Sequence, residues 1–156
     1  MDTGQILLMR HAEKSDDPRD PDLSPAGRER AQKLVAYIPA TFGKPDFMFA
    51  SAFSKHSHRP YETLEPLSNA IGVSIDKDFA DQDYGALAQE IETNPQYDGK
   101  RIIICWHHGN IPSFAHALKA ASSDYPDPWD PTVFNLILRF DFAQGAITAS
   151  QVVEPF

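Results

Sequence analysis

The chain has 156 residues, 42% of them hydrophobic, which is enough to bury the core of one ordinary domain without disulfides. Its formal charge of −8 argues against general binding to nucleic acid or to anionic membranes. The single cysteine, Cys105, excludes an intramolecular disulfide and lies in an apolar run, so we predict a buried thiol. We expect one domain over residues 1–156 in a soluble, cytoplasmic protein.

Short apolar runs of strand length alternate with helical patterns along the chain. Strands are predicted at 5–9, 46–50 and 102–106, and two more at 133–142 and 147–153, joined by a turn at 143–146. Helices are predicted from Ser24-Pro25 to about Gly43, from Pro60 to about Gly72 and from Pro112 to Ala121, with a shorter helix at 86–92. This order predicts a three-layer α/β/α fold with a mostly parallel central sheet.

Basic and imidazole side chains follow two of the predicted strands at the point where each strand ends. Arg10 and His11 come directly after the first strand, and His107 and His108 come directly after the strand that ends at Trp106. Ligands of parallel sheets bind beyond the carboxyl ends of the strands, so we expect these side chains to share one edge. Two adjacent residues of a continuing strand face opposite sides, so we expect only one of them to serve the site. We predict His108 for that role, because it directly precedes Gly109, and a packing role for His107.

Arg59, at the start of the second predicted helix, is expected at the same edge. Arginine makes planar, multidentate contacts with phosphate oxygens, and a largely neutral imidazole can attack phosphorus. Because the whole chain is acidic, a site for an anion has to concentrate positive charge locally. The predicted arrangement of Arg10, Arg59 and the histidines provides such a cradle for a phosphate group.

Four segments, in order along the chain, resemble the motifs of the histidine phosphatase superfamily, which includes the cofactor-dependent phosphoglycerate mutases. They are Arg10-His11-Ala12-Glu13, similar to Arg-His-Gly-Glu; Leu23-Ser24-Pro25-Ala26-Gly27, similar to Leu-Thr-x-x-Gly; Arg59-x-x-x-Thr63; and His108-Gly109-Asn110, similar to the segment of the second histidine. The resemblance covers about residues 5 to 120 and implies the phosphoglycerate mutase-like fold.

The resemblance also implies a mechanism that needs no metal or other cofactor. His11 accepts the phosphoryl group, Arg10, Arg59 and His108 hold its oxygens, and a carboxyl group protonates the leaving oxygen. The segment from Asp81 to Leu87 resembles the one that carries the donor and puts Asp81 in that role. Aspartate is one methylene shorter than the usual glutamate, so Asp83 and Glu13 stay as alternatives.

Two departures from the family pattern concern the neighbouring loops. Lys55 stands where a serine is usual, so the loop before Arg59 is built differently, and its Lys55, His56 and His58 add positive charge. Asp17 replaces an asparagine that many mutases carry, which disfavours the mutase activity and favours a small phosphatase. The expected partner is a small phosphorylated substrate or a phosphoprotein, with no role for nucleic acid or membrane.

Three other functions remain as alternatives. A metallohydrolase would use His56, His58, His107 and His108 as zinc ligands, but no His-x-x-x-His pair lies on a predicted helix. A catalytically impaired phosphate-binding protein would keep the fold with a defective donor at Asp81. A mutase would transfer the same phosphoryl group through the same histidine.

Overall fold

The computed structural model describes residues 1–156 and is built on one six-stranded sheet. The strands are β1 (Gly4–Arg10), β2 (Phe47–Ala50), β3 (Ile75–Asp76), β4 (Arg101–Trp106), β5 (Leu136–Ala143) and β6 (Ala146–Val153), in the spatial order β3-β2-β4-β1-β5-β6. Strands β3, β2, β4 and β1 pair in parallel, while β5 runs antiparallel to both β1 and β6. The mostly parallel sheet predicted from the sequence is confirmed.

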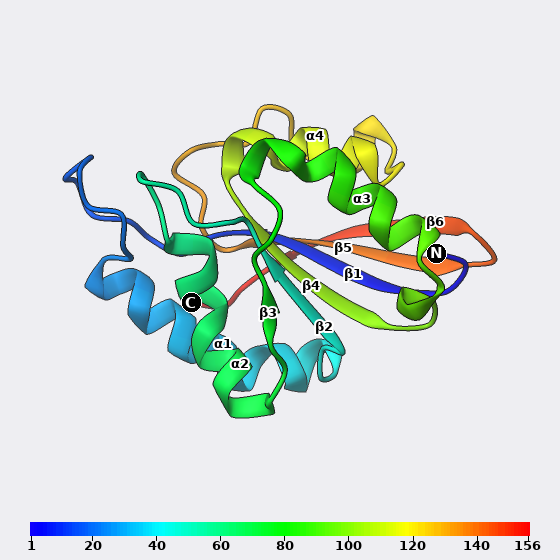
Figure 1. The fold of residues 1–156 in the computed structure, drawn as a ribbon, viewed down its shortest axis with the longest axis horizontal. Coiled ribbons are helices and arrows are strands. Elements are labelled where there is room, and N and C mark those ends of the chain that lie inside the picture. The colour runs from blue at the N-terminus through cyan, green and yellow to red at the C-terminus, as the bar shows by residue number, and fades with distance from the viewer.

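Helices cover both faces of the sheet (Figure 1). They are α1 (Pro25–Phe42), α2 (Arg59–Ile71), α3 (Tyr84–Thr93) and α4 (Ile111–Ala117), of which α1 and α2 cover one face and α3 and α4 the other. The alternation of side chains along β1 divides the core accordingly, because Ile6 and Leu8 join the apolar cluster with α3 and α4, while Leu7 and Met9 join the cluster with α1 and α2. Three layers therefore stack as predicted.

The ends of several elements differ from their predictions for local reasons. Strand β5 begins at Leu136 and not at Val133, whose carbonyl accepts the indole N–H of Trp129 outside the sheet. Helix α4 stops at Ala117, since Lys119 has a φ of 71° that no helix continues. Helix α3 is longer than the predicted segment at 86–92, and the two-residue strand β3 was not predicted at all.

Three features predicted from the sequence are confirmed in detail. The side chain of Ser24 caps α1 by accepting the amide N–H of Gly27 at 3.1 Å. The β5–β6 hairpin turns through Gln144 and Gly145, whose φ values of 53° and 75° match the left-handed turn that a tight hairpin requires. Cys105 is fully buried in the middle of the sheet, as predicted.

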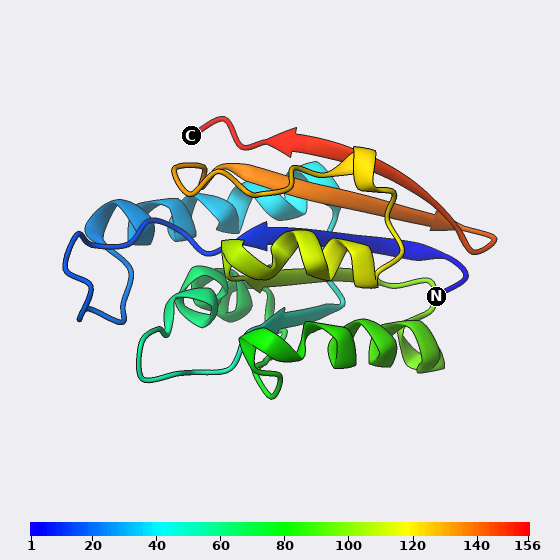
Figure 2. The ribbon, with the colours of Figure 1, turned by 90° about the horizontal axis from the view of Figure 1, so that it is seen from above.

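The loops after β1 and β2 and the loop before β5 gather at one end of the sheet (Figures 1 and 2). This is the end at which the parallel strands terminate, so the residues that directly follow β1 and β4 meet there. None of the helices is long and apolar enough to cross a membrane.

Candidate active site

The central strands bring His11 and His107 together. Arg10 pairs with Trp106 as the last register position of β1 and β4, so the next residue of each strand lies at the same level. The imidazole rings of His11 and His107 pack edge to face with centroids 5.4 Å apart. They border an open pocket of about 520 Å³ whose wall is mostly polar and includes Arg10, Lys14, Ser54, His56, Ser57, Arg59, Asp81, Gln82 and His108.

His11 is held in a defined orientation, with only 2% of its surface exposed. Its Nδ1 lies 2.7 Å from the carbonyl oxygen of Ala12, and because a carbonyl only accepts, this nitrogen carries the proton. Burial lowers the pKa of His11 well below its usual value, and the neighbouring His107, Arg10 and Arg59 lower it further. The ring is therefore neutral near pH 7, with Nε2 free as a nucleophile.

Arg10 is buried and is fixed from the loop that precedes β5. Its guanidinium carbon lies 3.8 Å from the centroid of the Phe134 ring, and its Nη1 donates to the carbonyl of Pro131 at 2.6 Å. Burial, with Arg59 as the next cause, lowers the pKa of Arg10 to about 10, so the side chain remains a cation at neutral pH. Its Nε is buried without a partner, which leaves a donor for an anion.

Arg59, the first residue of α2, is fixed in a similar way from the other side of the pocket. Its Nη1 donates to the carbonyl of Asp20 at 2.8 Å, and its buried Nε has no partner. Burial lowers the pKa of Arg59 although nearby carboxylates oppose this. Both arginines are thus oriented by main-chain carbonyls, which do not neutralise them, and both keep unused donors.

The strand ends before the two adjacent histidines, so both of them reach the pocket, where only one was expected. Both line the pocket, but His107 contacts His11, whereas His108 begins a 3₁₀ turn at 108–110. Burial lowers the pKa of His107, with Asp81 opposing and the arginines Arg59 and Arg10 adding to the effect. Of the two histidines, His107 is therefore the one whose ring packs against His11, because the strand already ends at Trp106.

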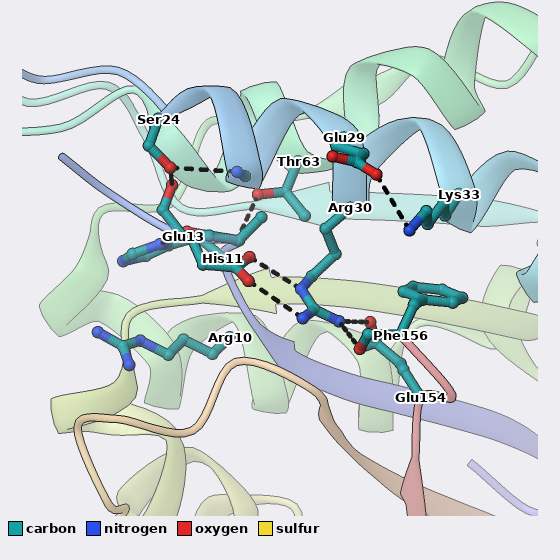
Figure 3. Close-up of polar contacts among 12 residues, drawn as sticks. Arg10, His11, Glu13, Ser24, Glu29, Arg30, Lys33, Thr63, Glu154 and Phe156 are labelled. Atoms are coloured by element: carbon teal, nitrogen blue, oxygen red, sulfur yellow. Dashed lines mark hydrogen bonds and ion pairs between the residues drawn. The ribbon is translucent and has the colours of Figure 1, made fainter.

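Of the three candidate proton donors, only Asp81 lines the pocket. Its Oδ1 is buried and has no hydrogen-bond partner. Asp83 is exposed at the start of α3, outside the pocket wall. Glu13 makes a two-pronged ion pair with Arg30 at 2.8 and 3.1 Å, and its carboxylate points toward Arg30 and away from the guanidinium of Arg10 (Figure 3).

The Leu-Ser-x-x-Gly segment at the start of α1 supports the loop that follows His11. The carbonyl of Glu13 accepts both the amide and the hydroxyl of Ser24, at 3.0 and 3.1 Å. A Cβ at Gly27 would clash with that same carbonyl oxygen, so only glycine permits this close approach of helix and loop. The residues of this motif are thus explained by the packing of the start of α1 against the loop after His11.

Thr63 couples the loop after His11 to the helix that carries Arg59. Its Oγ1 is fully buried and accepts the amide of Ala12 at 2.9 Å (Figure 3). The same hydroxyl donates to the carbonyl of Arg59 at 2.8 Å. The Arg-x-x-x-Thr spacing exists because these two residues stand one helical turn apart. One hydroxyl therefore ties the loop that follows His11 to the helix turn that begins at Arg59.

Replacing Thr63 by valine is expected to lower the free energy of unfolding by about 1–3 kcal/mol, because the buried amide of Ala12 would lose its acceptor. Thr63→Ser keeps the hydroxyl and should lose less stability than Thr63→Val. Thermal unfolding of the two variants beside the wild type measures this difference. A valine variant as stable as the serine variant would contradict the role of the hydroxyl.

The loop before Arg59 contributes less to the pocket than predicted. His56 lines the pocket, whereas Lys55 is exposed outside its wall and His58 pairs with Asp22 at 3.2 Å. Lys14 lines the pocket and adds a cation to it. Phe134, which stacks on Arg10, was not predicted. No group of three or more His, Cys, Asp or Glu side chains is arranged to hold a metal ion.

The sequence model of the histidine phosphatase superfamily (branch 1) matches residues 6–96, more than half of the chain. No curated protein matches the sequence significantly. Among solved structures, the fold is similar to a mycobacterial glucosyl-3-phosphoglycerate phosphatase (15% identity, 96% of this chain and 97% of that chain, TM-score 0.64). It is also similar to the protein histidine phosphatase SixA complexed with tungstate (14%, 96% and 96%, 0.65) and to phosphoglycerate mutase from Plasmodium falciparum (16%, 99% and 90%, 0.60). At these identities the likeness establishes the fold alone.

Proposed function

Because this chain belongs to the histidine phosphatase superfamily, we propose that it hydrolyses phosphomonoesters through a phosphohistidine formed on His11. The observation that carries the proposal is the state of His11, a buried and neutral imidazole whose Nδ1 is tied to Ala12 and whose Nε2 is free. Two arginines with unused donors, Arg10 and Arg59, line the same pocket, although the net charge of the whole chain is −8. This combination suits attack on a bound phosphate group.

In the first step, Nε2 of His11 attacks phosphorus in line, so that the N–P bond forms as the ester P–O bond breaks. Arg10, Arg59 and His107 hold the equatorial oxygens, and Asp81 gives a proton to the leaving oxygen. In the second step, water attacks the phosphohistidine, Asp81 takes the proton of that water, and His11 and inorganic phosphate are released. The chain's own residues supply every group in this scheme, and we propose that no metal takes part.

We assign the role of the second histidine to His107, with His108 at the outer wall of the pocket. Substitution His107→Ala is expected to lower kcat/KM by about 10²-fold or more, whereas His108→Ala should cost less than about 10-fold. The reason is that only His107 contacts the nucleophile's ring. Steady-state kinetics of both variants on one substrate measures the difference, and a larger loss for His108→Ala would reverse the assignment.

The proposed activity is tested with an aryl phosphate between about pH 5 and 8, a range in which the phosphate group changes charge. We expect steady hydrolysis by the wild type that a strong chelator leaves unchanged, and a slower rate for Asp81→Asn. Absence of hydrolysis by a folded wild-type protein would contradict the proposal. Loss of activity on chelation would favour the metallohydrolase instead.

The pocket is open and polar, so it accepts a small phosphoester as well as a phosphorylated side chain of a partner protein. A panel that contains sugar phosphates, phosphoglycerates, phosphoserine and a phosphohistidine-bearing protein distinguishes these substrates. Phosphoryl transfer between two positions of a phosphoglycerate, without release of phosphate, would identify the mutase alternative.

A further inference from the structure

The main chain of Asp81 is tied to the strand that carries His107. Trp106, the last residue of β4, is fully buried, and its indole N–H donates to the carbonyl oxygen of Asp81 at 2.9 Å. The side-chain amide of Asn110 approaches the same carbonyl at 3.4 Å. One main-chain oxygen of the loop between β3 and α3 thus has two donors, and both come from the segment on either side of His107 and His108.

The carboxyl group of Asp81, in contrast, has no anchor of its own. Its Oδ1 is buried and unpaired. The loop before it is fixed further upstream, where the amide of Ala52 donates to the carbonyl of Phe79 at 2.7 Å. The place of the carboxyl group within the pocket is therefore set through its main chain, and the indole of Trp106 fixes the main-chain carbonyl of the same residue.

We propose that Trp106, assisted by Asn110, is a positioning residue that holds Asp81 at the distance needed for proton transfer to the leaving oxygen. This inference rests on the proposed function. The hydrogen bond from the indole links the loop of Asp81 to β4, which ends beside His11. The proton donor and the nucleophile are therefore held by the same part of the sheet. The indole ring itself is fixed by an edge-to-face contact with Phe114, whose ring centroid is 5.1 Å away.

The alternative is that Trp106 only fills the core, where a buried indole N–H takes the nearest acceptor. The two roles differ in what they do to the reaction. In the first step, which kcat/KM reports, a misplaced donor slows only those substrates whose leaving oxygen is basic and needs a proton. A disturbed core alters the phosphate cradle itself, and so slows all substrates alike.

The test compares two phosphomonoesters, p-nitrophenyl phosphate, whose leaving group needs little protonation, and an alkyl phosphate, whose alkoxide needs a full proton. For Trp106→Phe, which keeps an aromatic ring and deletes the N–H, we expect kcat/KM on the alkyl phosphate to fall by about 10- to 100-fold. On p-nitrophenyl phosphate the fall should be less than about 3-fold. In an Asp81→Asn background the substitution should add no further difference between the two substrates.

Trp129→Phe is the matched control. Trp129 is also buried and its indole N–H donates to a main-chain carbonyl, that of Val133, at 3.1 Å. This carbonyl belongs to the loop that orients Arg10, so the control should slow both substrates equally. If Trp106→Phe also slows both substrates equally, or adds its effect in the Asp81→Asn background, the positioning role is overturned.

Asn110→Ala provides a second variant in case Trp106→Phe does not fold. It should show a smaller loss that is again confined to the alkyl phosphate, and an equal loss on both substrates would overturn the proposal. The wild type separates this result from the proposed function, because failure of the wild type on both esters contradicts the phosphatase activity. A wild type that hydrolyses both, with uniform losses in the variants, contradicts the positioning role alone.

Discussion

A His11→Asn variant is expected to lose phosphatase turnover by a factor on the order of 10⁴ to 10⁶, while it folds like the wild type. The asparagine amide can still donate to the carbonyl of Ala12, which His11 Nδ1 contacts at 2.7 Å, but no atom replaces the nucleophilic Nε2. The buried position then holds a neutral polar side chain in place of a neutral imidazole. Activity on p-nitrophenyl phosphate and the melting temperature measure the two halves of this prediction.

His116→Asn is the matched control, because His116 is exposed on α4 and lies outside the pocket. It should keep wild-type activity. The pH profile adds a second readout, since the lowered pKa of His11 means that the nucleophile stays neutral below the usual imidazole range. The acid limb of kcat/KM should therefore not begin at the pKa of an ordinary histidine. Substantial turnover by His11→Asn would require another nucleophile.

The second large effect is expected on stability, at Arg30. This side chain is 11% exposed and pairs with Glu13 and with Glu154, whose side chain is fully buried (Figure 3). The pair with Glu154 joins α1 to the segment after β6 at 2.9 Å. Arg30→Met leaves both carboxylates without their cation, and we expect it to lower the free energy of unfolding by about 3–5 kcal/mol. The melting temperature should fall by roughly 10 °C.

Lys33→Met is the matched control on the same helix. Lys33 pairs with Glu29 at 3.2 Å, but the two side chains are 48% and 69% exposed, so we expect a loss below about 1 kcal/mol. Equal shifts of the melting temperature for Arg30→Met and Lys33→Met would mean that burial does not distinguish the two pairs. Arg30→Met combined with Glu154→Gln should recover part of the loss, because one uncompensated charge is removed.

The pH dependence of this network follows from Glu154. Burial raises its pKa from 4.5 to about 7, against the lowering effect of Arg30. A carboxyl group with a raised folded-state pKa contributes stability that is present below the unfolded-state pKa and is lost as the pH rises through the folded-state value. Without Arg30 that value rises further, so the destabilisation by Arg30→Met should be larger at about pH 8 than at about pH 5.

Local patterns were sufficient to predict the elements that carry the site. The apolar run before Arg10 and the Ser24-Pro25 helix start were confirmed, because strand length, capping and turn chemistry depend on neighbours in the sequence. The position of His11 at the end of β1 followed from the same run. The Arg-x-x-x-Thr spacing also had a local cause, since Thr63 Oγ1 donates to the Arg59 carbonyl within one helical turn.

The two adjacent histidines show how a local motif and the strand register can favour different residues. The motif favours His108, which precedes Gly109, whereas the register favours His107, which directly follows the strand end. Because β1 ends at Arg10 and β4 ends at Trp106, His11 and His107 hold equivalent positions directly after their strands. The ends of the two apolar runs already indicated this in the sequence. The glycine after His108 carries no comparable constraint, because a Cβ there would meet open space.

Other parts of the site depend on contacts across the whole chain. Phe134 stacks on Arg10, and Glu154 pairs with Arg30, from positions more than a hundred residues away. No periodicity in a short window identifies such partners. Only Arg30 could have been identified from the sequence as a residue that needs a partner. It lies on the same helix face as the buried Gly27 and Leu34, and an arginine on a buried face requires a counterion.

The most direct test of the account is to trap the phosphorylated enzyme. The Asp81→Asn variant is mixed with p-nitrophenyl phosphate, quenched in alkaline denaturant, digested and analysed by mass spectrometry. We predict one phosphoryl group on His11, stable in base and lost in acid as a phosphoramidate is, and absent from His11→Asn. Turnover by the wild type without phosphate on His11, or a phosphoryl group on a different residue, would contradict the central claim.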